Sequence, residues 1–346
     1  MSVRWQAELA RQGAQFSDGR VATFGNGPEA GFSALRDGVV LCDLSHYGLM
    51  LASGDDAQAF LHGQFCNDVL ALGDNALQWN GWCSPKGRLL VTLLAWPGRQ
   101  GICMLLPRSL QGPIQKRLQM FILRAKVKIT DESENWVRFG VAGSRAEVLL
   151  REFMGAVPAD AMSTLRSRDG RIIRLSETRF MVIAPLDLAV TWWNELATKA
   201  VKVGAATWDW LSIQQGVITV LPETQDAFVP QMANFELIGG VSFKKGCYPG
   251  QEIVARTQYR GILKRRMVLA HMAGANSPMA GDKLYSEEFG DQAAGEIANV
   301  AAAPGGGVDM LVVAQIAAIR GNKLKYSSLD GVDVTIQRLP YDLPMS

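Results

Sequence analysis

The chain carries, between residues 243 and 252, the stretch Phe243-Lys244-Lys245-Gly246-Cys247-Tyr248-Pro249-Gly250-Gln251-Glu252. Gly246 and Gly250 allow backbone conformations that other residues avoid, and Pro249 stiffens the turn. The pattern predicts a strand, a tight loop and then a helix. A loop so constrained holds whatever side chains it carries in fixed positions.

Cys247 is the candidate reactive residue of this loop. It follows Lys244 and Lys245 and precedes the expected start of a helix, two features that favour a thiolate over a thiol. The alternative is a small buried cysteine in a loop that only turns the chain. The other four cysteines lie in apolar or strand-like segments and are expected in the core; they are Cys42, Cys66, Cys83 and Cys103.

Basic residues gather in and after this loop. Residues 244–266 contain seven basic residues and a single acidic one, Glu252. The basic residues are Lys244, Lys245, Arg256, Arg260, Lys264, Arg265 and Arg266. Such a cluster attracts a phosphate or a carboxylate, although a solvated basic face explains it equally well. Glu252, Arg256 and Arg260 follow at intervals of four, so they share a helix face and can pair. Glu252 therefore has a structural interpretation beside a role in ligand binding.

The composition is that of a globular protein with two or three lobes. The chain has 346 residues, 48% of them apolar and 20% charged, and single cores stop growing near about 250 to 300 residues. Its five cysteines are too few and too scattered for a disulfide framework, and their odd number leaves at least one thiol free. A reducing, cytoplasmic location is expected. The net charge of +2 does not itself demand a nucleic-acid partner.

No segment predicts export or membrane insertion. Residues 1–10 have charges at Arg4 and Glu8 and lack the apolar core of a signal peptide. The most apolar runs, Leu89 to Trp96 and Met310 to Ile319, are eight and ten residues long, whereas about 18 are needed to span a bilayer. We therefore expect a soluble protein with no membrane partner.

The first half of the chain alternates β-like runs with helical ones, which predicts α+β lobes. Strands are expected at 39–44, 47–52, 89–96, 102–106, 136–142 and 172–183, and helices at 55–62, 107–123 and 187–203. From Arg265 onward, short strands are broken by Gly, Pro and Asn, which indicates a small β-barrel beginning near residue 263. The glycines at 305–307 are expected at a hairpin tip because no helix pattern follows them.

Familiar catalytic and metal-binding patterns are missing from the sequence. The histidines are His46, His62 and His271, and neither His-x-x-x-His nor Cys-x-x-Cys spacing occurs. A zinc site or a standard cluster-binding motif is therefore not supported. A Cys–His nucleophile pair stays open because its partners can lie far apart in the chain.

The stretch from Phe243 to Arg256 resembles the hallmark of the YgfZ-type folate-binding proteins, relatives of the aminomethyltransferase (T-protein) of the glycine cleavage system. Further matches are Phe60-Leu-His-Gly-Gln64, Ser84-Pro-Lys-Gly-Arg88, Phe228-Val-Pro-Gln231, Lys264-Arg-Arg266 and Leu339-Pro-Tyr341. The resemblance implies a three-lobed ring. Residues 1–262 would form two intertwined α+β lobes, one of them at roughly 53–130, and residues 263–346 a β-barrel.

The same resemblance implies a tetrahydrofolate site. A flat pterin needs an aromatic or apolar wall, and its glutamate tail needs cations. The aromatic positions that YgfZ-type proteins associate with folate match Tyr47 and Trp210, each of which would otherwise be a core residue. Lys86 and Arg88 are candidates for the folate tail, unless they only form a solvated hairpin tip. The matched hallmark adds Lys244, Lys245, Gln251, Glu252 and Arg256, whose cations would hold an anion or raise the thiolate fraction of Cys247.

Two departures from the T-protein bear on the reaction. An acidic pair that the T-protein carries after a Gly-rich turn matches the segment Lys86-Gly87-Arg88-Leu89-Leu90-Val91, in which apolar side chains replace the acids. A glutamate that grips the pterin in the T-protein matches Met181. The loss of the acidic pair is shared by other YgfZ-type sequences, so it is a trait of that family.

The resemblance therefore implies a folate-binding accessory protein without turnover of its own. It would support assembly or repair of 4Fe-4S clusters and, through a radical methylthiotransferase, tRNA modification, with Cys247 acting on a cluster, a persulfide or a one-carbon adduct. Contact with tRNA would be indirect. One alternative is a folate-dependent one-carbon transferase, which has the scaffold but lacks the acid. Another is an RNA-binding module built on Arg260, Lys264 and Arg265, although interleaved aromatic residues are missing there.

Overall fold

The computed structural model describes residues 1–167, 169–259, 261 and 263–344, and the chain divides into two compact units. Unit 1 comprises Met1–Gln58, Ala71–Gln78 and Leu94–Trp208, and unit 2 comprises Ala59–Leu70, Trp79–Leu93 and Asp209–Ser346. Each unit is thus built from segments that lie far apart in the sequence. Arg260, which the sequence places on one helix face with Glu252 and Arg256, lies outside the described residues.

A six-stranded sheet forms the centre of unit 1. Its strand order is β10-β11-β12-β9-β3-β13, and β13 runs parallel to its neighbour β3. These strands are β3 (Val40–Asp43), β9 (Val137–Ala142), β10 (Ser163–Ser167), β11 (Gly170–Ser176), β12 (Arg179–Ala184) and β13 (Val201–Val203). Strands β9 and β12 are buried along their whole length, which explains why apolar residues dominate both strands in the sequence.

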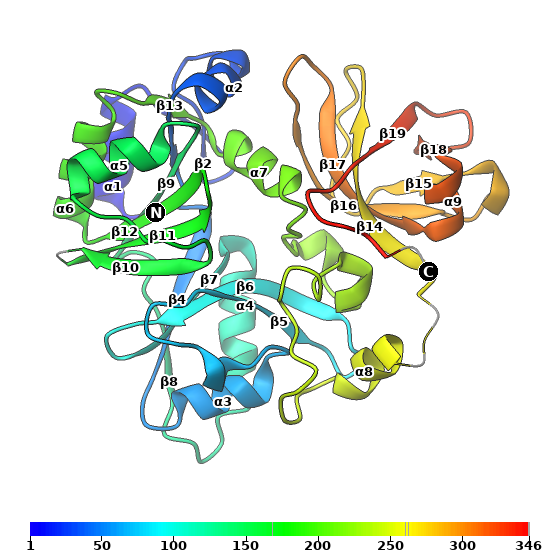
Figure 1. Ribbon diagram of the computed structural model, residues 1–346, viewed down its shortest axis with the longest axis horizontal. Helices are drawn as coiled ribbons and strands as arrows, with labels where there is room; N and C mark the ends of the chain where they lie inside the picture. Colours follow the sequence, from blue (N-terminus) through cyan, green and yellow to red (C-terminus); the bar gives the residue numbers. More distant parts are fainter. Residues whose placement is uncertain (168, 260, 262, 345–346) are drawn as a thin grey trace. The chain divides into compact units, whose positions relative to one another are not determined.

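Three helices pack on this sheet in Figure 1, namely α1 (Val3–Arg11), α5 (Ala146–Met154) and α6 (Leu186–Leu196). Trp193 of α6 lies in the core that these helices cover. The centre of its ring lies 5.4 Å from that of Trp5 and 5.6 Å from that of Phe139, and both pairs are edge-on. Aromatic pairs in this geometry stabilise the core beyond the burial of their area. The Trp5 indole donates to the buried Asp43 carboxylate at 2.7 Å, so the indole N–H is paired within the core.

Helix α2 (Pro28–Asp37) and the hairpin of β1 (Gln15–Ser17) and β2 (Arg20–Thr23) complete the N-terminal segment.

A second sheet has the strand order β5-β6-β7-β4-β8. Its strands are β4 (Tyr47–Ser53), β5 (Gln78–Cys83), β6 (Leu89–Pro97), β7 (Gly101–Pro107) and β8 (Lys128–Asp131). Strands β6 and β7 form the predicted antiparallel hairpin, in which Trp96 lies opposite Cys103. Helix α3 (Ala57–Gln64) follows β4, and helix α4 (Arg108–Gln119) follows β7.

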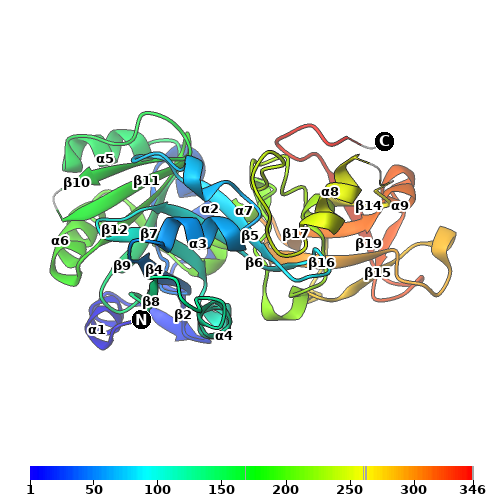
Figure 2. The same cartoon turned by 90° about the horizontal axis from the view of Figure 1, so that it is seen from below.

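A closed six-stranded barrel lies in unit 2, with the order β14-β17-β16-β15-β18-β19. Its strands are β14 (Arg265–Met272), β15 (Lys283–Tyr285), β16 (Gly295–Ala302), β17 (Val308–Gln315), β18 (Leu324–Tyr326) and β19 (Asp333–Gln337). Figures 1 and 2 show helix α9 (Ile316–Gly321) against strands β14 and β17. The glycines at 305–307 form the predicted β16–β17 hairpin tip. The expected α+β fold with a C-terminal barrel is thereby confirmed.

The remaining helices are α7 (Ala205–Gln214), α8 (Gln251–Tyr259) and short 3-10 turns at Val69–Ala71, Pro222–Thr224, Pro230–Ala233 and Glu287–Phe289. Helix α8 confirms the helix predicted after the loop at Cys247. Among the helices that the structure describes, none combines the length and the apolar character needed to cross a membrane.

Four predicted elements need correction. The run at 172–183 holds two strands, β11 and β12, separated by a turn at residues 177–178. The helix expected at 187–203 ends at Leu196, and the residues after it return as the edge strand β13. The helix expected at 107–123 ends at Gln119, and Val241 to Phe243 form no strand. Short apolar runs fit a strand, a helical turn or a buried loop, so pattern alone misplaces these ends.

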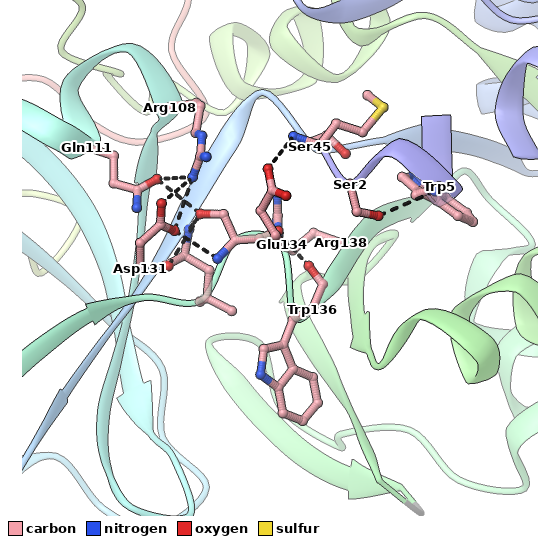
Figure 3. A network of polar contacts seen from close by, with 12 residues as sticks. Ser2, Trp5, Ser45, Arg108, Gln111, Asp131, Glu134, Trp136 and Arg138 are labelled. Carbon is pink, nitrogen blue, oxygen red and sulfur yellow. Dashed lines mark hydrogen bonds and ion pairs between the residues drawn. The ribbon is translucent and has the colours of Figure 1, made fainter. Parts of the chain in front are cut away.

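Arg138 joins several segments of unit 1 from the inside, as Figure 3 shows. Its guanidinium is 1% exposed and donates to the main-chain oxygens of Ser133, Trp136 and Tyr47 at 2.6, 2.5 and 3.0 Å. Burial lowers the pKa of Arg138 to about 10, so it remains charged at neutral pH, and the nearby Asp43 carboxylate favours that charge. One buried cation therefore fixes the start of β4 and the loop before β9.

Candidate functional site

The loop at residues 244–250, here called the Cys247 loop, lies directly on the β5–β6 turn at residues 84–88. Gly250 has a φ of 81°, and a Cβ on it would stand 2.4 Å from the Ser84 carbonyl oxygen and 2.7 Å from the Gly87 Cα. Gly87 has a φ of 69° and is equally crowded. Both the left-handed backbone and the close approach require glycine at these positions. The two turns therefore interlock without side chains between them.

Lys245 anchors the Cys247 loop from inside. Its side chain is buried, and its ammonium group donates to the main-chain oxygens of His62 and Phe65, the latter at 2.8 Å. The same ammonium lies 4.8 Å from the centre of the Tyr248 ring, a cation–π contact. Burial lowers the pKa of Lys245. The sequence counts Lys245 among the folate residues, but its charge points into the protein and holds the loop.

Cys247 projects from the outer side of the same loop. Its side chain is exposed, as are the neighbouring residues Lys244 and Gly246, whereas Lys245 and Tyr248 are buried. Gly246 has no positive φ, so the backbone freedom expected there is used only at Gly250. The exposure of Cys247 removes the alternative of a buried filler.

The other cysteines have the character expected of core residues. Cys42, Cys66 and Cys83 are buried, and Cys103 is partly exposed. The Cys66 thiol hydrogen-bonds to Cys83, and together with burial this raises the pKa of Cys83. Burial raises the pKa of Cys103 to about 11. The thiols of Cys83 and Cys103 are therefore protonated and unreactive at neutral pH.

His62, on α3, lies beside the Cys247 loop. Its Nε2 is the nearest heavy atom to a Cβ built on Gly246, at 3.8 Å, and its Nδ1 lies 3.1 Å from Asp68 Oδ1. A neighbouring carboxylate fixes the orientation of a histidine ring. His62 therefore stands beside Gly246 with its ring oriented by Asp68, while the Cys–His pair that the sequence leaves open stays untested.

The β5–β6 turn presents two exposed cations, Lys86 and Arg88. The Arg88 guanidinium donates to the Ala227 carbonyl oxygen at 2.5 Å, so its position is partly fixed. Nearby, Ser84 Oγ and Asp226 Oδ1 are buried and have no hydrogen-bond partner in the part of the chain that the structure describes. Unpaired buried polar atoms are unfavourable, so the Asp226 carboxylate has a free acceptor, and the Ser84 hydroxyl can donate or accept one further hydrogen bond.

Trp210 is oriented by a carboxylate that the sequence does not single out. Its indole Nε1 donates to Asp309 Oδ2 at 2.8 Å, and Gln214 Nε2 donates to the same oxygen at 2.8 Å. Asp309 Oδ1 lies 2.8 Å from His271 Nδ1. Asp309 is only 5% exposed, so these donors offset the burial of its charge. No local motif marks Asp309, because its partners come from distant segments.

Two further positions that the family resemblance singles out lie in unit 1. Tyr47 begins β4, is half-buried, and has its ring centre 4.6 Å from that of His46. Met181 lies within β12 and is 2% exposed. A methionine there supplies an apolar contact and no charge.

Helix α8 carries the remaining predicted residues. Gln251 Nε2 donates to the Gly246 carbonyl oxygen at 3.5 Å, which closes the Cys247 loop. Glu252 and Arg256 are exposed, and in the described residues neither takes part in an ion pair. Within the same residues there is no group of three or more His, Cys, Asp or Glu side chains that could hold a metal ion.

Comparison with known proteins gives three concordant likenesses. Residues 10–241 match the protein family described as the GCVT N-terminal domain. The chain is 30% identical over 247 residues to the tRNA-modifying protein YgfZ of Hamiltonella defensa subsp. Acyrthosiphon pisum (strain 5AT), covering 70% of this chain and 72% of the relative. It is 32% identical over 263 residues to the protein of the same name from Enterobacter sp. (strain 638), covering 74% and 79%.

The third likeness is one of fold. The crystal structure of glycine cleavage system aminomethyltransferase T from Bartonella henselae matches with a TM-score of 0.83, covering 98% of this chain and 97% of the other, at 16% identity.

We predict that Gly250→Ala destabilises the protein and that Gly246→Ala does not. An alanine at 250 meets both the left-handed backbone and the Ser84 carbonyl, which together should lower the free energy of unfolding by about 3 kcal/mol. An alanine at 246 has its nearest neighbour at 3.8 Å and should stay within about 0.5 kcal/mol of the parent. Urea denaturation measures both. Equal stability of the two variants would contradict the interlocked turns.

We also predict that iodoacetamide alkylates Cys247 alone in the native protein at pH 8. For Cys103, the rise of the pKa from 9.0 to about 11 lowers the thiolate fraction about 100-fold. Peptide mass spectrometry identifies the labelled residue, and Cys247→Ser is the control that should take up no label in the same time. Labelling of Cys66 or Cys83 before Cys247 would show that the loop is not presented as described.

Proposed function

This chain belongs to the YgfZ family and carries the GCVT N-terminal domain, and from that membership we propose that it is a tetrahydrofolate-binding accessory protein of tRNA modification. Its relatives carry the name of tRNA-modifying proteins. The observation that carries the proposal is the exposed Cys247 thiol on a loop fixed by Gly250 and Lys245. A thiol held in this way is reachable by a partner protein without rearrangement of the loop.

The side chains present fit a folate. A pterin needs a flat aromatic wall, and Trp210 offers a half-buried indole whose orientation is set by Asp309. The glutamate tail needs cations, and Lys86, Arg88 and Lys244 are exposed. The unpaired Ser84 Oγ and Asp226 Oδ1 add hydrogen-bonding capacity beside the β5–β6 turn. Tyr47 is proposed as a second aromatic contact on the strength of the family resemblance.

In this proposal the protein's own groups bind and position. Tetrahydrofolate, when bound, carries one-carbon units. Trp210 stacks on the ring system, the exposed cations hold the acidic tail, and Cys247 acts on a cluster, a persulfide or a one-carbon adduct. The 4Fe-4S partner is a radical methylthiotransferase in the cytoplasm, and tRNA is reached through that enzyme.

The apolar residues of strand β6 do not support an independent transferase activity. Where the resemblance places the acids of the T-protein, Leu90 and Val91 are buried and apolar. A buried aliphatic side chain neither accepts a proton nor stabilises a developing positive charge. We therefore assign the chain no turnover of its own.

The proposal is tested by complementing a strain that lacks this gene. Wild type and Cys103→Ser should restore methylthiolated tRNA, measured by mass spectrometry of digested tRNA, whereas Cys247→Ser should give at least about ten-fold less because the reactive thiol is gone. Equal restoration by Cys247→Ser, with equal protein levels, would remove the thiol from the mechanism.

A separate prediction concerns the carboxylate behind Trp210. Asp309→Asn removes the negative charge and leaves one acceptor oxygen where two now meet Trp210, Gln214 and His271, so the indole should be held less firmly. We expect about ten-fold weaker binding of 5-formyltetrahydrofolate by calorimetry, which corresponds to about 1.4 kcal/mol. The matched control is Asp282→Asn, another barrel carboxylate, which accepts from the Tyr326 hydroxyl at 2.8 Å. Unchanged affinity in Asp309→Asn, or equal loss in both variants, would refute the role of Asp309.

A further inference from the structure

A cavity of about 270 Å³ in unit 1 belongs to neither the Cys247 loop nor the residues proposed for folate. One side is apolar and is formed by Leu51 of β4, Trp96 of β6 and Cys103 of β7. These three lie in register across the sheet, since Cys103 pairs with both Leu51 and Trp96. Ile183 of β12 lines the opposite side. A ring system that enters the cavity therefore meets a flat apolar surface.

Trp136 adds an indole ring to the lining of this cavity. Figure 3 shows its indole extending away from the Arg138 cluster, and the residue lines the cavity. Its main chain is fixed because Arg138 donates to its carbonyl oxygen. The indole is half-buried, so part of its face is accessible to an aromatic partner, which favours offset or edge-on stacking.

Arg171 brings a positive charge without a counter-ion to the same cavity. It is 8% exposed, and its guanidinium donates to Thr164 Oγ1 and to the Pro97 carbonyl oxygen at 2.5 and 2.7 Å. Both partners are neutral, and no ion pair joins Arg171 to an acid among the described residues. Burial lowers the pKa of Arg171, and the neighbouring charge of Arg166 acts in the same direction. A buried cation of this kind is unfavourable, and an anion in the cavity offsets that cost.

The rim of the cavity carries charges of both signs, and among them Arg99 and Asp169 pair with each other at 3.1 Å. Arg166 donates to the Gly98 carbonyl oxygen at 3.2 Å, which joins two hairpin turns and holds a second guanidinium near Arg171. Glu132 also lines the cavity and accepts from Thr130 Oγ1 and Asn135 Nδ2, each at 2.7 Å. A ligand with an acidic group for Arg171 and Arg166 and ring N–H groups for Glu132 suits this lining.

We propose that this cavity binds a small planar aromatic acid, its ring between Trp136 and the apolar side and its acidic group at Arg171 and Arg166. The volume is at the lower end of ligand sites, which span about 300–1,000 Å³, so one ring system with a short acidic arm fits and a complete folate does not. None of the residues proposed for folate lines it. An aromatic carboxylate and a nucleoside monophosphate share this chemistry.

The test is calorimetric titration of the full chain with indole-3-acetate and, separately, with adenosine 5′-monophosphate. Arg171→Gln removes the charge while keeping an amide donor, and Leu51→Trp fills the cavity without altering a charge. Arg4→Gln is the control, because Arg4 is exposed and pairs with Asp187 outside the cavity. Thermal unfolding of each variant establishes that it is folded.

We expect saturable binding of at least one probe, weakened at least about ten-fold by Arg171→Gln and by Leu51→Trp and unchanged by Arg4→Gln. The probe that binds identifies the source of the acid, and either result supports the site. Leu51→Trp decides the matter if Arg171→Gln does not fold. Binding that neither variant weakens, absence of binding by both probes at millimolar concentration, or displacement by 5-formyltetrahydrofolate would overturn a separate site.

Discussion

The contact between Gly250 and the β5–β6 turn is the constraint on which the proposed site depends. A Cβ at Gly250 would stand 2.4 Å from the Ser84 carbonyl oxygen, so only glycine permits the two backbones to meet. Once they meet, Lys245 and Tyr248 turn inward and Cys247 turns outward. The Cys247 side chain is thus placed by backbone contact between two turns that lie far apart in the sequence.

The cations near Cys247 serve two different purposes, which a count of charges does not distinguish. Lys245 holds the loop through main-chain oxygens. Arg266, also in the basic stretch, is buried and donates to the Gln231 carbonyl oxygen at 2.8 Å and to the Glu236 carboxylate at 2.5 Å. Lys244 remains exposed. Fewer cations of this stretch are therefore available to an anion than the sequence suggests, and those that are exposed include Lys244, Arg256 and Lys264.

The sequence predicts the parts of the fold that local patterns control. The β6–β7 hairpin, helix α8 and the C-terminal barrel follow from apolar alternation, turn residues and the hallmark around Cys247. The sequence does not predict elements that depend on tertiary contacts. The short edge strand β13 forms because Val201–Val203 pair with β3 in parallel, and no local pattern indicates this pairing. Asp309 is missed for the same reason, since its role is visible only in its contacts with Trp210 and His271, which lie in other segments of the chain.

This chain shares the fold of an aminomethyltransferase although only 16% of the residues are identical. The fold is therefore kept with few shared residues. The residues that hold this chain together are buried polar groups with main-chain partners, such as Arg138 and Lys245, together with the glycines of the interlocked turns. None of them needs an acid at the position of Val91, which packs as a core residue. A fold maintained in this way leaves the Cys247 thiol exposed with an apolar residue at position 91. The shared fold therefore does not by itself carry the reaction of the aminomethyltransferase, and the role proposed for this chain depends on the side chains at its own sites.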